Sequence, residues 1–280
     1  KICFKGESEI TEDFNINAEK VKAAITPRTK AIIAVDIAGF PCDYDQLYSI
    51  IEEKKAEFKA GSEQQEKLGR ILLISDAAHS FGATMNGKIS GNLADVSSFS
   101  FHAVKNLTTA EGGAVCFNLP ENFDHDAIYK EFCTLILHGQ SKDALAKAQK
   151  GNWRYDVEEP GFKCNMTDLQ AAIGLVELDR YQENLDRRKT IFEAYDAAFA
   201  TKDWAITPLY KNEHKETCYH LYLLRIAGAT EAQRDAIMQE IFDQDVSVNV
   251  HFQPLPILTA YKKRGYKIED YPETWNKYSN

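Results

Sequence analysis

Three patterns are missing from the sequence, and each absence argues against a class of protein. No apolar run approaches the roughly 20 residues that a membrane-spanning helix needs, so we expect no membrane segment. There is no long basic run and the net charge is −9, which argues against a nucleic-acid partner. No GxGxxG pattern follows a strand, which argues against a nicotinamide-binding Rossmann enzyme.

The six cysteines also lack a spacing with a chemical role. They are scattered without a CxxC pair, and Cys3, Cys116 and Cys218 lie in apolar or strand-like surroundings that indicate small core residues. We predict no metal site. This cysteine usage fits a reducing compartment, and the amino terminus has no signal-peptide pattern. We therefore expect a cytoplasmic protein.

The chain is long enough to bury a large core, since it has 280 residues with 44% hydrophobic content. We expect one large and one small domain. A helix that begins near Thr167 or Asp168 continues through Arg180, Arg187 and Arg188, and this places the boundary near residue 185. The predicted division is 1–185 and 186–280.

The most informative stretch of the sequence is a predicted strand followed closely by a lysine. Residues 96–101 form a β-prone run, and after it come His102, Lys105 and the pair Gly112-Gly113. Burial lowers the pKa of a lysine, and the neutral amine is the form that condenses with a carbonyl group. The alternative is an ordinary solvated loop lysine.

A second apolar run supplies a carboxylate. Residues 70–75 read as a buried strand that ends on Asp76. Two strands that each deliver a polar residue at the carboxyl end are typical of an open α/β sheet with a ligand in its crevice. A lysine and an acid there suit pyridoxal phosphate (PLP), because the amine forms a Schiff base with the aldehyde. The carboxylate keeps the pyridine nitrogen protonated, so that the ring accepts electrons.

Four blocks of sequence carry a resemblance to a known family. They are DAAHSFGA (76–83), SFHAVKNLTT (100–109), EGG (111–113) and EPGFKCNMTDLQAAIG (159–174). In this order they resemble the DegT/DnrJ/StrS sugar aminotransferases, which are fold-type-I PLP enzymes acting on nucleotide-linked keto sugars. The implied fold is α/β and aspartate aminotransferase-like. It has a mainly parallel sheet flanked by helices, plus a smaller carboxyl-terminal α+β domain.

The resemblance implies roles for five residues around the cofactor. Lys105 is the Schiff-base lysine and moves a proton between the α-carbon of the donor and C4′ of the cofactor, and Asp76 is the partner of the pyridine nitrogen. His79 contacts the ring or its 3′ oxygen, unless it only packs at a helix start. Ser100 donates to the phosphate, unless it is an ordinary strand-end serine. Lys163 stands where many relatives have an asparagine that reaches the phosphate of the neighbouring subunit.

Two further residues are candidates for binding the substrate. Trp153 lies in an irregular polar stretch, 140–156, which is either a lid for a sugar nucleotide or a surface or dimer-contact loop. His251 lies in a segment similar to the family's substrate-side loop, and a packing role is its alternative, as it is for His220. The family usually has histidine where this chain has Asp36.

The implied reaction transfers an amino group from an amino acid, with glutamate expected, to a nucleotide-linked keto sugar. The expected assembly is a homodimer with shared active sites. Family members that act as sugar dehydratases replace the lysine with histidine, so Lys105 argues against that chemistry. The family's first segment, which holds the cofactor phosphate, has no counterpart here. We therefore interpret the sequence as a fragment, and a non-catalytic or truncated homologue is the remaining alternative.

The periodicity also predicts the local structure. Asn86-Gly87 is typical of a hairpin turn within residues 83–90, and Asp43 and Gln46 suggest a capping box. The expected helices cover 18–25, 44–55, 120–137 and 230–243, and the other expected strands cover 31–35, 112–117, 217–226 and 246–252.

Overall fold

A four-stranded sheet forms the centre of the computed structural model, which describes residues 10–142, 149–151 and 153–280. The strand order is β1-β2-β5-β6. The first three strands run parallel, and β6 runs antiparallel to β5 at one edge. The bounds are β1 (Ala31–Val35), β2 (Leu72–Asp76), β5 (Val96–Ser100) and β6 (Gly113–Phe117). The predicted α/β fold with a mainly parallel sheet is confirmed.

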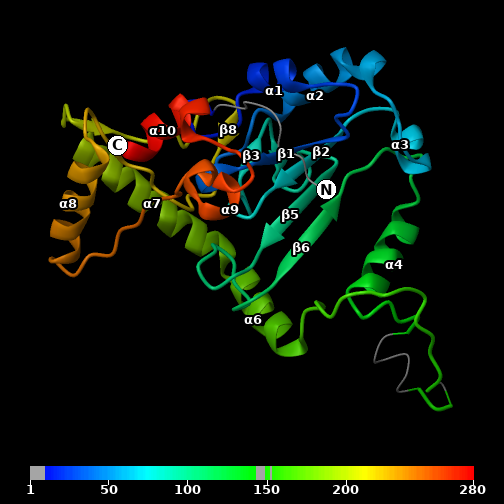
Figure 1. Cartoon of the computed structure of the whole chain (residues 1–280). Helices are drawn as coiled ribbons and strands as arrows, with labels where there is room; N and C mark the ends of the chain where they lie inside the picture. Colours follow the sequence, from blue (N-terminus) through cyan, green and yellow to red (C-terminus); the bar gives the residue numbers. More distant parts are fainter. Residues whose placement is uncertain (1–9, 143–148, 152) are drawn as a thin grey trace.

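Helices α1 (Ala18–Ala24) and α2 (Tyr44–Glu53) contact each other and lie on the same side of this sheet (Figure 1). Their apolar faces join Leu73 and other strand residues in the main core. The α2 cap is only half the predicted capping box. Asp43 accepts from Gln46 N at 3.1 Å, but the Gln46 side chain donates to Glu19 instead.

The predicted hairpin is present. Strands β3 (Thr84–Met85) and β4 (Lys88–Ile89) pair antiparallel, and β8 (Lys215–Glu216) extends them into a small sheet. Asn86 and Gly87 both have positive φ, 50° and 75°, which is the backbone that a two-residue type I′ turn requires. Through β8, this hairpin connects the early part of the chain to a segment far along the sequence.

Helices α6 (Asp168–Asp179) and α7 (Tyr181–Phe199) form a rod that is nearly continuous in Figure 1. Thr167 begins α6 with a complete capping box to Gln170. The two helices are separated at Arg180, whose ψ of 7° departs from helical geometry, so the single helix predicted there is wrong. The predicted boundary near residue 185 falls inside α7, and the division into two domains stays a prediction.

Two predicted strands in the last third of the chain are wrong. Only Arg225–Ile226 of the predicted strand 217–226 is a strand (β9), and residues 246–252 contain none. Tyr219 has a φ of 55°, which a strand cannot accommodate. The backbone N–H groups of Thr217 and Cys218 bond to Tyr210 O and Gly39 O. The first residues of the segment therefore bond to Tyr210 and Gly39 instead of pairing with a neighbouring β-strand.

The remaining elements complete the described chain. Helix α4 starts at His125 and not at 120, because Asp124 caps it by accepting from Ala127 N at 2.9 Å. Cys3 lies outside the described residues, Cys116 is half-buried and Cys218 is buried. The other bounds are α3 (Glu63–Leu68), α4 (His125–Leu135), β7 (Ala205–Ile206), α8 (Glu231–Phe242), α9 (Thr259–Lys262), α10 (Pro272–Ser279) and the short 3-10 turns η1 (Ile37–Gly39), η2 (Lys55–Glu57), η3 (Leu255–Ile257) and η4 (Ile268–Asp270).

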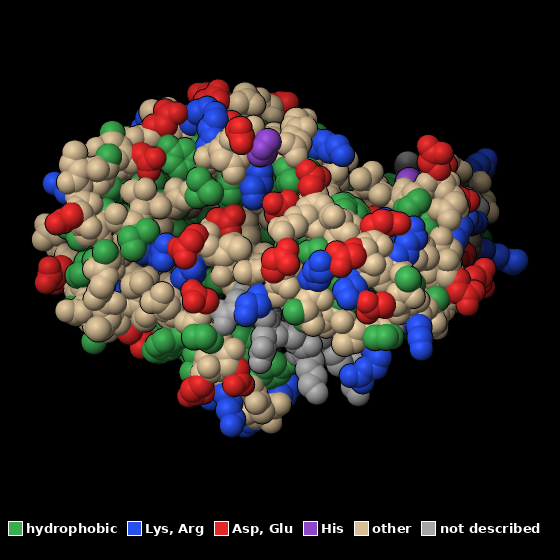
Figure 2. Space-filling view, turned by 90° about the horizontal axis from the view of Figure 1, so that it is seen from above, with side chains coloured by type: hydrophobic (Ala, Val, Ile, Leu, Met, Phe, Trp, Pro, Cys, Tyr) green, Lys and Arg blue, Asp and Glu red, His purple; other side chains and the backbone are tan. Residues whose placement is uncertain are grey.

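The surface mixes charges of both signs. On the face shown in Figure 2, acidic and basic side chains alternate, and those coloured there form no broad basic patch. Within the described part of the chain, no helix combines the length and apolar character needed to cross a bilayer.

Candidate active site

The carboxyl ends of β2 and β5 meet at one edge of the sheet. Asp76 is the last residue of β2 and lies beside Val35 on one side and Ser98 on the other. One of its carboxylate oxygens accepts from Ala78 N at 3.2 Å. Ser100 is the last residue of β5, and its hydroxyl oxygen lies 3.4 Å from His102 N. Parallel pairing thus brings the ends of both predicted strands together.

Lys105 lies on the tight loop that follows β5. Lys105 N donates to His102 O, and Thr109 N returns to Phe101 O, each at 2.9 Å. The side chain is half-buried, and this burial lowers the pKa of Lys105, while the carboxylate of Asp76 raises it. The amine and the carboxylate are therefore within electrostatic reach of each other. The net effect favours the neutral amine, which is the nucleophilic form.

Three histidines surround this pair. The rings of His79 and His220 have centroids 4.6 Å apart. Burial lowers the pKa of His79 to about 4, helped by the positive charges of Lys105 and His251. Burial also lowers the pKa of His220, to about 3, with His79, Lys105, Arg188 and His251 adding to the effect. The pKa of His251 is lowered by burial and then by Lys105. The lowered pKa of each ring favours its neutral form.

Two nitrogens of these rings are buried without a partner. Among the described residues, Nδ1 of His79 and Nδ1 of His251 have no hydrogen-bond partner although both are inaccessible to solvent. A buried polar atom in a folded protein normally has a partner, because leaving it unpaired costs about 1–3 kcal/mol. These nitrogens point to a polar ligand group as the missing partner.

Asn106 ties the lysine loop to a distant segment. Its Nδ2 donates to Cys218 O at 2.6 Å, and its Oδ1 lies 2.9 Å from Nδ1 of His220. The thiol of Cys218 in turn donates to His79 O at 2.8 Å. Residues 217–220 therefore touch both the Lys105 loop and the His79 turn. Sequence reasoning assigned no role to Asn106 and favoured packing for His220, since no spacing pattern connects them.

A glycine permits this close approach. Gly39 has a φ of +89°, and a Cβ there would lie 2.5 Å from Cys218 Sγ and 2.8 Å from His79 O. Both distances are shorter than any normal contact. Glycine at this position allows the backbone after β1 to pack directly against the His79 turn and residues 217–218.

Asp36 is fully buried beneath the His79 turn. It accepts from Cys42 N at 2.9 Å, and the hydroxyls of Ser80 and Tyr44 each lie 2.7 Å from its carboxylate oxygens. Burial raises the pKa of Asp36, and these hydrogen bonds oppose that rise. The carboxyl group thus anchors Ser80, the residue after His79.

Two predicted site residues lie outside this cluster. Lys163 is exposed and donates to the Asn165 side chain. Trp153 is 69% exposed and stacks with the Arg154 guanidinium, 5.1 Å from the ring centroid. The other predicted residues lie within electrostatic reach of one another. Asp76 affects the pKa of Lys105, and Lys105 and His251 affect the pKa values of His79 and His220.

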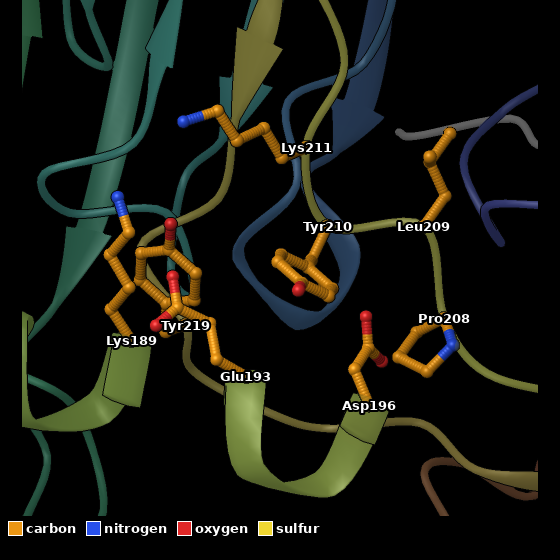
Figure 3. Close-up of a pocket in the computed structure, with 8 residues that line it drawn as sticks. All are labelled: Lys189, Glu193, Asp196, Pro208, Leu209, Tyr210, Lys211 and Tyr219. Atoms are coloured by element: carbon orange, nitrogen blue, oxygen red, sulfur yellow. The ribbon is translucent and has the colours of Figure 1, made fainter. Parts of the chain in front are cut away.

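A separate pocket of about 350 Å³ lies on α7 (Figure 3). Lys189 and Glu193 of α7 lie toward Tyr219, and Asp196 of α7 lies toward Tyr210 of the segment 208–211. Its polar groups already pair with protein groups: Lys189 bonds to Glu216 at 3.1 Å, and Tyr222 donates to Asp196 at 2.6 Å. The candidate site residues do not line it, and we assign it no ligand.

Comparisons with known proteins identify the family of this chain. The DegT/DnrJ/EryC1/StrS aminotransferase family matches residues 9–280. Uncharacterized protein MJ1066 of Methanocaldococcus jannaschii is 38% identical over 93% of the chain. The spore coat polysaccharide biosynthesis protein SpsC of Bacillus subtilis is 34% identical over 94%. The chain spans 63% of the length of each of these two relatives.

Solved structures show the same fold. A candidate sugar aminotransferase of Streptococcus pneumoniae, Spr1654, in its PMP form superposes with a TM-score of 0.92 and 45% identity. The match covers 97% of this chain and 68% of that one, and a PLP form of Spr1654 matches as well. PseC of Helicobacter pylori, an aminotransferase of pseudoaminic acid biosynthesis, matches with a TM-score of 0.75 and 25% identity, covering 91% of this chain and 61% of that one.

The fold is therefore that of the fold-type-I PLP-dependent enzymes. The chain belongs to the DegT/DnrJ/EryC1/StrS aminotransferase family, whose cofactor is PLP. The residues present fit this cofactor, since a half-buried lysine, a carboxylate and an unpartnered histidine nitrogen converge at the end of the sheet. Within the described ranges, no group of three or more histidine, cysteine or acidic side chains is arranged to hold a metal ion.

Proposed function

We propose that the protein containing this chain is a PLP-dependent aminotransferase. It moves an amino group from an amino acid, glutamate, to a nucleotide-linked keto sugar. The observation that carries the proposal is the half-buried amine of Lys105 within electrostatic reach of the carboxylate of Asp76. The names of Spr1654, PseC and SpsC support a sugar as the acceptor and polysaccharide biosynthesis as the setting.

When bound, PLP supplies an aldehyde that carries the amino group and a ring that accepts electrons. Lys105 would hold the cofactor through its Nζ, and its lowered pKa favours the neutral amine that could accept a proton from the donor α-carbon. Asp76 holds a proton on the pyridine nitrogen. The unpartnered Nδ1 of His79 suits the 3′ oxygen, and Ser100 donates its hydroxyl to the phosphate.

The other predicted roles complete the proposal. His251, with its unpartnered Nδ1, contacts the substrate from the small domain, and the exposed Trp153 covers it. Lys163 reaches the cofactor phosphate of a second copy of the chain. A homodimer is supported by the apolar surface of α6, where Leu169, Leu175 and Val176 are more than half exposed. The cysteines that the structure describes are free thiols, which supports the cytoplasm as the compartment.

The direct test compares Lys105→Ala with Lys88→Ala, an exposed lysine in β4, in the full-length protein. Lys105→Ala is expected to abolish turnover, and Lys88→Ala to retain it. Borohydride treatment followed by peptide mass spectrometry is expected to find the cofactor on the peptide that contains Lys105. Turnover at the wild-type rate by Lys105→Ala would refute the proposal.

The same assay separates the alternatives. An aminotransferase consumes one glutamate and releases one 2-oxoglutarate for each amino sugar that it forms. A sugar dehydratase would remove water from the sugar without consuming glutamate. A non-catalytic homologue would bind no cofactor, and its visible spectrum would stay that of the protein alone.

A further inference from the structure

The hydrogen bonds of Asn106 determine which ring nitrogen of His220 carries a hydrogen. A carbonyl oxygen only accepts, so the Asn106 atom 2.6 Å from Cys218 O must be the amide nitrogen. The amide oxygen then faces Nδ1 of His220 at 2.9 Å. Because that oxygen also only accepts, Nδ1 must donate. The neutral His220 ring is therefore the Nδ1–H tautomer, in which Nε2 carries no hydrogen.

Neutrality of His220 agrees with this assignment. The ring is buried, and burial lowers its pKa to about 3, together with the charges of His79, Lys105, Arg188 and His251. Arg188 also donates to the backbone carbonyls of Tyr219 and His220, at 3.3 and 3.5 Å. A neutral ring adds no positive charge beside the amine of Lys105. The one N–H group of the neutral ring donates to the amide oxygen of Asn106.

Asn106 is the next residue after Lys105, so its side chain restrains the position of the lysine backbone. The loop itself is closed by the bonds Lys105 N to His102 O and Thr109 N to Phe101 O. The amide of Asn106 adds the connection to residues 217–220. Loss of the His220 donor would leave the buried amide oxygen of Asn106 without a partner. The side chain of Asn106 would then hold the Lys105 loop less firmly.

We propose that His220 is a positioning residue, which acts through Asn106 to hold the Lys105 loop so that the amine stays half-buried and within electrostatic reach of Asp76. This inference rests on the proposed role of Lys105. The titratable groups around the amine are Asp76, His79, His220 and His251. Release of the loop would expose the amine to water, and the ammonium form would become more favourable.

The test measures the ionisation of Lys105 without relying on activity. Full-length protein freed of cofactor is treated with limiting acetic anhydride across a range of pH. Acetylation of Lys105 is then read by mass spectrometry relative to the exposed Lys88. The variants are His220→Leu, Asn106→Ala, the double variant, and His220→Asn. His220→Asn places an amide donor near the former Nδ1. His214→Asn is the control, since that side chain is 62% exposed.

We expect His220→Leu and Asn106→Ala to move the midpoint for Lys105 to higher pH. Acetylation below the midpoint should fall about threefold, equivalent to about half a pKa unit. The double variant is expected to match Asn106→Ala, because that substitution already removes the bond to His220 together with the bond to Cys218 O. His220→Asn and His214→Asn are expected to keep the wild-type midpoint. Circular dichroism verifies folding, and His220→Met, whose side chain has no hydrogen-bond donor, replaces His220→Leu if the latter does not fold.

An unchanged midpoint in folded His220→Leu, or in its replacement, would overturn the inference. So would additive shifts in the double variant, or a shift in His220→Asn as large as in His220→Leu. None of these results bears on the proposed function, which is decided by turnover of Lys105→Ala. A failed transaminase assay, in turn, leaves the acetylation measurement valid.

Discussion

The carboxylate of Asp76, at the end of β2, acts on the amine of Lys105, on the loop that follows β5, across the end of the sheet. Burial lowers the pKa of Lys105 and the charge of Asp76 raises it, with burial the larger effect. A lysine in open solvent would stay charged at neutral pH. The pair therefore combines an amine that gives up its proton more readily than a free lysine with a carboxylate that can stabilise a neighbouring positive charge.

Asp76→Asn tests the carboxylate directly. The amide has nearly the same shape but cannot hold a proton on the pyridine nitrogen, so we expect kcat to fall by about 100-fold or more. Steady-state kinetics on the full-length protein would measure this loss. Asp235→Asn, at an exposed position on α8, is the control and should retain activity. A kcat within a factor of about three of wild type in Asp76→Asn would contradict the assigned role.

Gly39→Ala tests the close approach at the His79 turn. The added Cβ would lie 2.5 Å from Cys218 Sγ and 2.8 Å from His79 O. Gly265 has the same φ of +89° with open space around it, so Gly265→Ala measures backbone strain alone. We expect that strain to cost about 1–2 kcal/mol, and Gly39→Ala to cost about 1–3 kcal/mol more from crowding. Urea unfolding would compare them, and equal costs would argue against the crowding.

The ion pair of Arg70 and Asp95 supports the strands below the site. Asp95 is 1% exposed, and two guanidinium nitrogens of Arg70 lie 2.7 Å from its oxygens. Asp95 also accepts from Leu73 N at 2.8 Å. Asp95→Ala leaves a partly buried guanidinium and a buried N–H without their partner. We expect a loss of about 3–5 kcal/mol in the free energy of unfolding.

The matched control for that pair is the exposed pair of Lys22 and Glu53, 2.7 Å apart. Water screens such a pair, so Glu53→Ala should change the unfolding free energy little. Denaturant unfolding of both variants makes the comparison. Similar losses in the two variants would show that burial does not set the strength of the Arg70 pair.

Stability should fall as the pH drops from 7 to 5. Burial lowers the pKa of His79 to about 4 and of His220 to about 3, whereas an unfolded histidine titrates near 6.5. Below pH 6.5 the unfolded chain therefore binds more protons than the folded one, and this favours unfolding. The contribution of the neutral histidines is complete above pH 6.5 and is lost toward the folded pKa values.

The variant His220→Asn removes one of these groups, so its unfolding free energy should depend less steeply on pH between 7 and 5. His214→Asn, at an exposed position, should keep the wild-type slope. Chemical unfolding at several pH values provides the measurement. Parallel pH profiles for wild type and His220→Asn would contradict the burial of a neutral ring.

Local patterns predicted the elements that position the site. The apolar runs that end at Asp76 and before His102 became parallel strands, and the Asn86-Gly87 turn has the expected backbone. These features depend on neighbours in the sequence. The strand predicted over 217–226 failed because Thr217 N bonds to Tyr210 O and Cys218 N bonds to Gly39 O, the latter far away in the chain. The pairing of Asn106 with His220 spans 114 positions. It depends on tertiary contact alone, which composition and periodicity do not encode.

The crossing of residues 217–221 against the His79 turn also limits how the molecule can be divided. Leu221 N donates to Ala38 O and Cys218 N to Gly39 O, while the Cys218 carbonyl receives the Asn106 amide. A piece cut after residue 185 would lose these partners. The lysine-bearing half would then expose the carbonyls of Ala38 and Gly39 and the amide of Asn106 without these partners.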